Sequence, residues 1–215
     1  MEIINYDTKV ETTNKHHFLF PNSIRAIIAG NSGCGKTNLI MNLLLNKGWL
    51  NYNRVYLYTN TYDQDKYKLL ENFFNLLEKG TKVKIYQRLN CDEIISPSSL
   101  DKELNNVVVF DDCMLDKQNI MAEYFTQGRH KNCDIFYLAQ SYYQIPKHTI
   151  RDNANFVILF KQDKKSIQAI YESLSSGDMD LKEFKHLFYE CTKDKYRFFT
   201  IDLSSDIKTG KCRKN

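Results

Sequence analysis

The chain has 215 residues, of which 42% are hydrophobic and 26% are charged, and its formal net charge is +4. These values are typical of a soluble globular protein with a sizeable core, and the mild positive charge permits a polyanionic partner without requiring one. The N-terminus lacks an apolar signal core and every apolar run is shorter than the ~20 residues of a membrane span, so we expect a protein made and used inside a cell, with no membrane span.

The predicted elements alternate between strands and helices. Residues 1–20 are polar and irregular, which predicts an extension or an edge strand. The apolar run 24–30 predicts a buried strand, and a helix with apolar residues at helical spacing follows it. Further strands are predicted at 54–59, 82–87, 106–112, 133–141, 155–160 and 196–203, and further helices at 63–79, 116–130, 163–175 and 181–192. This alternation predicts an α/β fold with a mostly parallel central sheet flanked by helices.

The stretch GNSGCGKT, residues 30–37, matches the phosphate-loop pattern G-x-x-x-x-G-K-[ST] in full. It lies between a predicted strand and a predicted helix, so its glycines let the backbone approach a phosphate at a helix N-terminus. Lys36 supplies a catalytic charge that reaches the β- and γ-phosphates, and Thr37 offers a hydroxyl to Mg²⁺. The predicted cofactors are ATP and Mg²⁺. The predicted nucleotide-binding residues are Gly30, Asn31, Ser32, Gly33, Cys34, Gly35, Lys36, Thr37 and Asn38.

A second acidic motif, VVVFDD, ends the predicted strand 106–112 in two aspartates, as in a Walker B strand. Asp111 is predicted to hold Mg²⁺ with Thr37. Asp112 occupies the position where many such ATPases carry a glutamate that deprotonates the attacking water. Aspartate is one methylene shorter, so the water must sit closer or the backbone must advance. The same two residues would also suit a helix N-cap.

Three further side chains are candidates for the catalytic step. Gln140 ends the strand 133–141, where one large class of P-loop ATPases carries a polar sensor of the γ-phosphate and the lytic water. Arg129 and Arg151 lie just before and just after that strand, and either is a candidate for an arginine that a neighbouring subunit supplies. The alternatives are a polar residue at a solvated strand end for Gln140, and a surface or DNA-contacting arginine for the other two.

Several classes of P-loop protein lack support in the sequence. The stretch NKGW at 46–49 lacks the aspartate with which GTPases read guanine. The stretch SLSSGD at 173–178 follows the Walker B strand, whereas ABC transporters place their similar signature before it. The arginine-rich lid of small-molecule kinases is missing, and too little chain remains for the helical lid domain of an AAA+ protein.

The stretches AGNSGCGKTNLI, VVVFDD and GRHKNCDIFYLAQSYYQIPKHTIRDNANFVILF together resemble the viral DNA-packaging ATPases of large double-stranded DNA viruses, virophages and Polinton-like elements, a branch of the FtsK/HerA superfamily. The resemblance spans residues 24–203 and implies a RecA-like (ASCE) P-loop fold. It implies a motor, built as a ring of identical chains, that pumps double-stranded DNA without reading its sequence into a preformed capsid. A capsid or portal-vertex protein would be its partner, at the site of virion assembly in the host cytoplasm or nucleus, or on the virion. The superfamily usually has Asp-Glu where this chain has Asp111 and Asp112, which leaves the general base open.

Composition and this resemblance together predict an extension of residues 1–20, a P-loop ATPase domain of residues 21–203 and a basic tail of residues 204–215. We expect the tail to be mobile, either solvated or touching DNA. The segments 88–106 and 140–148 are both candidates for the loop that grips DNA.

Two other functions stay open from the residues. One is a nucleotide-switched assembly or scaffold protein with negligible turnover, which the unusual Asp112 favours. The other is a replication helicase or partition-type ATPase, which would prefer single-stranded DNA or need a partner. The six cysteines form no C-x-x-C pair, so we expect reduced thiols.

Overall fold

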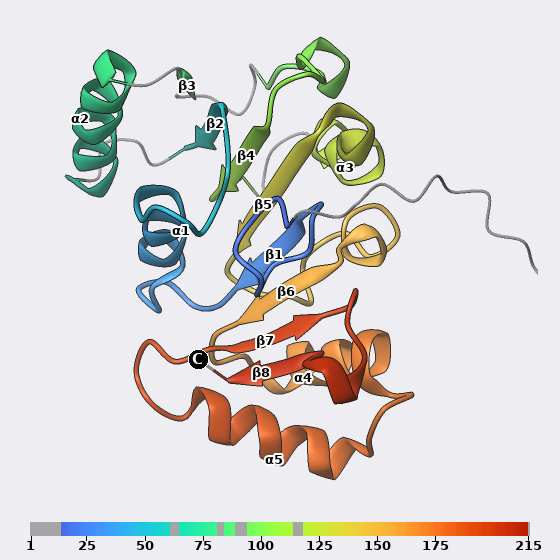
Figure 1. The fold of residues 1–215 in the computed structure, drawn as a ribbon. Helices are drawn as coiled ribbons and strands as arrows, with labels where there is room; N and C mark the ends of the chain where they lie inside the picture. Colours follow the sequence, from blue (N-terminus) through green and yellow to red (C-terminus); the bar gives the residue numbers. More distant parts are fainter. Residues whose placement is uncertain (1–13, 61–64, 81–83, 89–93, 114–117, 215) are drawn as a thin grey trace, which may run out of the picture.

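A mixed eight-stranded sheet with the order β3-β2-β4-β5-β1-β6-β7-β8 forms the centre of the molecule (Figure 1). The computed structural model describes residues 14–60, 65–80, 84–88, 94–113 and 118–214. The strands are β1 (Arg25–Ala29), β2 (Arg54–Thr59), β3 (Lys84–Arg88), β4 (Asn106–Asp111), β5 (Cys133–Ala139), β6 (Phe156–Leu159), β7 (Phe199–Asp202) and β8 (Cys212–Lys214). The first six strands run parallel to one another, and β7 pairs antiparallel with both β6 and β8, which confirms the predicted α/β fold with a mostly parallel sheet.

Helices cover both faces of the sheet. They are α1 (Lys36–Leu45), α2 (Asp65–Gly80), α3 (Gln118–Gln127), α4 (Lys164–Ile170) and α5 (Leu181–Thr192). The predicted helix 163–175 is α4 continued by one π-helical turn, Tyr171–Ser175. In Figure 1, α1 and α2 lie on one face of the sheet and α3 on the other.

The core has two layers because successive residues of a strand point to opposite faces. In β4, Val107 and Val109 pack with α1 and α2, whereas Val108 and Phe110 pack with α3. All six residues of β4 are buried. A strand covered on both faces is mostly apolar, as Val107–Phe110 are here, which is why the middle of such a segment reads as a continuous hydrophobic run.

Strand order decides where the predicted motifs meet. β5 lies between β1 and β4, as expected for the ASCE class. Because β1, β5 and β4 are parallel, their carboxyl ends form one edge of the sheet, and the residues that follow each strand gather there.

The C-terminal tail departs from expectation. Residues 212–214 form β8 on the edge of β7, so the predicted mobility is wrong for this segment. Arg213 explains the order, because its guanidinium pairs with the buried Asp202 and donates to the carbonyl of Leu19 at 2.5 Å. A basic tail can therefore form an edge strand when one of its charges pairs with a buried acid of the neighbouring strand.

Residues 14–20 are joined to the sheet by an ion cluster. Lys15 and His16 lie 2.7 and 3.0 Å from one carboxylate oxygen of the buried Asp134, at the start of β5. The other oxygen of Asp134 accepts from the backbone of Ile24 at 2.8 Å. These contacts fix the chain just before β1 and the phosphate loop.

The state of the cysteines and the absence of a membrane span were also predicted from the sequence. Cys34, Cys133, Cys191 and Cys212 are free thiols, but Cys113 is disulfide-bonded, so the prediction of uniformly reduced cysteines is wrong there. Cys91 lies outside the described residues. Among the described helices, none is long and apolar enough to cross a membrane.

Candidate nucleotide-binding site

The loop between β1 and α1 is shaped by its glycines. Gly33 and Gly35 have φ angles of 73° and 110°, a region that L-residues with side chains rarely adopt. At Gly30, a Cβ would lie 2.6 Å from the Cβ of Phe160 and 2.7 Å from the Sγ of Cys34, so no side chain fits. The backbone N–H of Gly30 donates to the carbonyl of Ala139 at 3.1 Å and thereby ties the loop to the end of β5.

The loop presents positive charge at the carboxyl edge of the sheet. Lys36, the first residue of α1, donates from Nζ to the carbonyls of Gly30 at 2.6 Å and Asn31 at 3.2 Å. The Lys36 ammonium is therefore held against the start of the phosphate loop. The first N–H groups of α1 add the partial positive charge of a helix N-terminus, which favours a phosphate.

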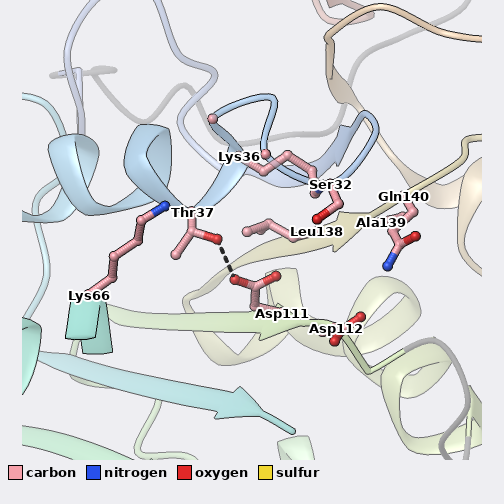
Figure 2. Close-up of a pocket in the computed structure, with 11 residues that line it drawn as sticks. Ser32, Lys36, Thr37, Lys66, Asp111, Asp112, Leu138, Ala139 and Gln140 are labelled. Carbon is pink, nitrogen blue, oxygen red and sulfur yellow. Dashed lines mark hydrogen bonds between the residues drawn. The ribbon is translucent and has the colours of Figure 1, made fainter. Parts of the chain in front are cut away.

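Thr37 and Asp111 meet as the sequence predicts. The Thr37 hydroxyl donates to Oδ2 of Asp111 at 2.9 Å (Figure 2). The Tyr67 hydroxyl donates to the same oxygen. Burial raises the pKa of Asp111, against the opposing effects of these two hydrogen bonds and of the Lys36 charge. Burial, followed by the Asp111 carboxylate, raises the pKa of Tyr67, which keeps its hydroxyl a proton donor.

This pair of oxygen ligands fits Mg²⁺. A hydroxyl and a carboxylate are the hard donors that magnesium prefers, and magnesium usually takes one or two protein ligands while water and phosphate oxygens complete its octahedron. Within the described part of the chain there is no cluster of three or more histidine, cysteine or acidic side chains that could form a closed metal cage. Thr37 and Asp111 are therefore the residues that would hold the metal.

Asp112 and Gln140 lie beside this pair. Asp112 directly follows β4 with φ 60°, a left-handed conformation that aspartate tolerates better than most residues. Gln140 directly follows β5. Both side chains are exposed, and Figure 2 shows the Asp112 carboxylate and the Gln140 amide facing the same part of the pocket.

One cavity of about 130 Å³ collects these groups. Its lining residues are Ser32, Gly33, Gly35, Lys36, Thr37, Lys66, Asp111, Asp112, Leu138, Ala139 and Gln140. Among the predicted nucleotide-binding residues, Gly30 lies beneath the loop, Asn38 is exposed on the first turn of α1, and Asn31 and Cys34 line a different cavity.

Lys66 and Tyr67 are site residues that the motifs did not identify. Both belong to the first turn of α2, and Figure 2 shows the Lys66 side chain reaching toward Thr37. Only the expected place of this helix in the fold could have indicated these two residues. A helix after a parallel strand starts at the carboxyl edge of the sheet, and β2 lies next to the Walker B strand β4.

The two candidate arginines do not line the cavity. Arg129 is exposed just before β5 begins, at the edge of the sheet opposite the phosphate loop. Its charge is close enough to Arg25, at the start of β1, to lower the pKa of that residue in addition to burial. Arg151 is only 9% exposed, and its guanidinium carbon lies 5.2 Å from the ring centroid of Tyr142. A role for either arginine in a neighbouring subunit's site stays a prediction.

Comparison with known proteins gives three results. The family model described as "Poxvirus A32 protein" matches residues 11–211. The DNA packaging protein OPG160 of Variola virus and that of Vaccinia virus (strain Western Reserve) are each 29% identical over 133 residues, which is 57% of this chain and 47% of theirs. The chain thus spans about half the length of these curated relatives.

Among solved structures, the genome packaging NTPase B204 of Sulfolobus turreted icosahedral virus 2, in complex with AMPPCP, matches with a TM-score of 0.60 at 15% identity, over 91% of this chain and 98% of that one. The DNA-packaging ATPase B204 of Sulfolobus Turreted Icosahedral Virus also gives 0.60, at 16% identity, over 87% and 95%. At this identity the likeness shows the fold, which is that of a P-loop NTPase.

Proposed function

We propose, from the premise that this chain belongs to the Poxvirus A32 protein family, that it is an ATP-hydrolysing motor that moves double-stranded viral DNA into a preformed capsid. The observation that carries the proposal is one pocket that brings together Lys36 at the start of α1, Asp111 at the end of β4 and Gln140 directly after β5. The names of the relatives, which describe DNA packaging, support the biological setting at the site of virion assembly.

In this mechanism the loop and Lys36 hold the triphosphate. Thr37 and Asp111 would hold Mg²⁺, which when bound neutralises charge on the β- and γ-phosphate oxygens. Asp112 accepts a proton from the attacking water, and the Gln140 amide orients that water against the γ-phosphate. Lys66 adds a second cation from the same chain at the rim of the pocket.

Gln140 also begins a connected route to a basic surface. The next residue, Ser141, has its hydroxyl 3.0 Å from that of Ser166 in α4, and the backbone N–H of Tyr143 donates to Ser166 at 3.4 Å. The N–H of Tyr142 donates to the side chain of Gln162 at 3.2 Å. A shift of Gln140 on loss of the γ-phosphate would therefore move segment 141–143 together with the start of α4.

This surface suits a phosphodiester backbone. We define the basic flank as the exposed residues Lys147, His148, Lys164 and Lys165. The exposed ring of Tyr143 lies in the same region, lining one hollow with Lys164 and Lys165 and another with Lys147. Cations and an aromatic ring without a built pocket for a base would grip DNA without reading its sequence. Of the two candidate gripping segments, we therefore favour 140–148.

The remaining parts of the proposal need neighbouring molecules. A ring of identical chains would place an arginine of one subunit at the next subunit's γ-phosphate, and the exposed Arg129 is better suited than the stacked Arg151. A capsid or portal-vertex protein would hold the ring at the entry point of the particle.

ATP hydrolysis by the purified protein, with and without long double-stranded DNA, tests the proposal. We expect turnover that rises with duplex DNA and disappears in Lys36→Ala. ATP binding without DNA-dependent turnover, in protein shown to be oligomeric, would favour the nucleotide-switched assembly protein. Stimulation by single-stranded DNA alone would favour a helicase-type ATPase.

A further inference from the structure

The hydrolytic groups all lie on one side of the phosphate loop. Asp112 and Gln140 follow β4 and β5, which lie on one side of β1, whereas β6 and β7 lie on the other. A nucleotide on this loop must point its γ-phosphate toward Asp112 and Gln140. Its nucleoside must then leave the loop on the side of β6 and β7.

A second cavity lies on that side. It measures about 320 Å³, within the range of small-molecule sites, which is roughly 300–1,000 Å³. Asn31 and Cys34 of the phosphate loop form part of its wall, and segment 192–197 forms much of the rest. Because β7 is antiparallel to β6, the segment before β7 lies at the carboxyl edge of the parallel strands, beside the loop.

Tyr196 differs from the other residues of this cavity in its contact with the phosphate loop, its exposure and its backbone angle. Its ring carbon Cδ1 lies 3.4 Å from the position that a Cβ on Gly35 would take, so the ring borders the phosphate loop directly. The side chain is nevertheless 55% exposed. Its φ of 66° lies in the left-handed region, which is an outlier for a bulky aromatic residue. Such strain at a ligand-facing residue suggests a functional position.

Charged groups surround this ring. Lys195 Nζ lies 4.9 Å from the ring centroid of Tyr196, and Lys193, Asp194 and Arg197 also line the cavity. A planar aromatic surface at the edge of a phosphate-binding loop is suited to stack on a nucleic-acid base. The neighbouring cations suit the phosphate that joins the nucleoside to the rest of the triphosphate, and Asp194 suits an amino group on the base.

We propose that this cavity is the nucleoside subsite of the ATPase, with the flat base of a nucleoside triphosphate stacked on Tyr196. The inference rests on the proposed function, since it extends the same bound nucleotide across the loop. It makes Tyr196 a residue that binds the base, separate from Lys36 and Thr37, which bind the phosphates and the metal.

Calorimetric titration with ATP and with inorganic tripolyphosphate, both with Mg²⁺, tests the assignment. We expect the wild-type protein to bind ATP more tightly than tripolyphosphate. Tyr196→Ala should weaken ATP binding about tenfold, the lower end of measured stacking losses, and leave tripolyphosphate binding unchanged. Tyr196→Phe should keep the wild-type affinity for ATP. Tyr189 lies on α5 and is 61% exposed, so Tyr189→Ala is the matched control and should change neither affinity.

The other possible results of these titrations contradict either the nucleoside subsite or the proposed function. An equal loss of both ligands in Tyr196→Ala, or no loss of ATP affinity, overturns the subsite. Wild-type protein that binds tripolyphosphate as tightly as ATP also overturns the subsite, while the phosphate loop of the proposed function stands. Wild-type protein that binds neither ligand contradicts the proposed function itself. Unchanged melting temperatures establish that the variants are folded.

Discussion

The hydroxyl of Tyr67 donates to the same carboxylate oxygen of Asp111 that accepts from Thr37. Tyr67 is 2% exposed and comes from the first turn of α2, so a residue outside both predicted nucleotide motifs holds Asp111, the predicted metal ligand. Partners of this kind fix a metal ligand in the conformation that binds.

Removal of that hydroxyl should weaken the metal site. We expect Tyr67→Phe to lower the apparent affinity for Mg²⁺ about tenfold, because Asp111 loses the partner that orients it. The measurement is ATP binding by calorimetry across a range of Mg²⁺ concentrations. ATP binding in excess chelator serves as the control and should match the wild type. An unchanged Mg²⁺ dependence would show that Thr37 alone positions the acid.

The role of Asp112 as general base can be separated from binding. Asp112→Asn keeps the size of the side chain but removes the proton acceptor. We expect kcat to fall about 10²- to 10⁴-fold while ATP affinity is retained. Asp112→Glu, which restores the residue usual in the superfamily, should retain turnover. Steady-state kinetics and ATP titrations measure the two effects, and full turnover in Asp112→Asn would assign the base elsewhere.

The phosphate loop should not tolerate a side chain at its first glycine. Gly30→Ala places a Cβ 2.6 Å from the Cβ of Phe160, the residue after β6, so either the loop or Phe160 must move. We expect a loss of about 1–3 kcal/mol of unfolding free energy and loss of ATP binding. Gly177→Ala is the control, since nothing lies within 4 Å of its added Cβ. Urea denaturation of the two variants compares them, and equal stability would contradict the predicted crowding.

Asp163 caps α4 and gives a pH-dependent prediction. Its side chain accepts from the N–H of Ser166 at 2.8 Å, and this bond lowers the pKa of Asp163 below its ordinary value of 3.8. The folded state therefore favours the ionised form. The resulting stabilisation is complete above the ordinary pKa and is lost as the pH falls through the lowered one.

Loss of this cap should follow the same pH dependence. Asp163→Ala should destabilise the protein by about 1 kcal/mol at pH 7. The difference from wild type should stay constant down to the ordinary pKa of 3.8 and shrink below it. Denaturant titrations over this range measure the difference. Asp163→Asn keeps the hydrogen-bond acceptor without the charge, so it should be less stable than wild type at pH 7 and should approach it once Asp163 is protonated, whereas a pH-independent loss in Asp163→Ala would refute the charge effect.

Much of the site could be predicted because its chemistry is local. The strand, turn and helix around Gly30–Thr37 are contiguous, and each glycine is required by its own backbone angle or nearest contact. Asp111 ends one buried strand and Gln140 directly follows another, and the apolar runs of both strands can be recognised in the sequence. Only the parallel direction of those strands was then needed to place the acid and the amide at one edge.

The sequence by itself determined the class of fold, the phosphate loop and the acids, since short-range geometry and hydrophobic patterning decide them. Only the tertiary structure decided that Tyr67 holds Asp111, that Tyr196 borders Gly35, and that Arg213 joins the tail to Asp202. It also decided that Arg151 is stacked on Tyr142 away from the pocket. These pairs depend on which helices and strands become neighbours, and that choice comes from the packing of the whole sheet, which leaves no local pattern in the chain.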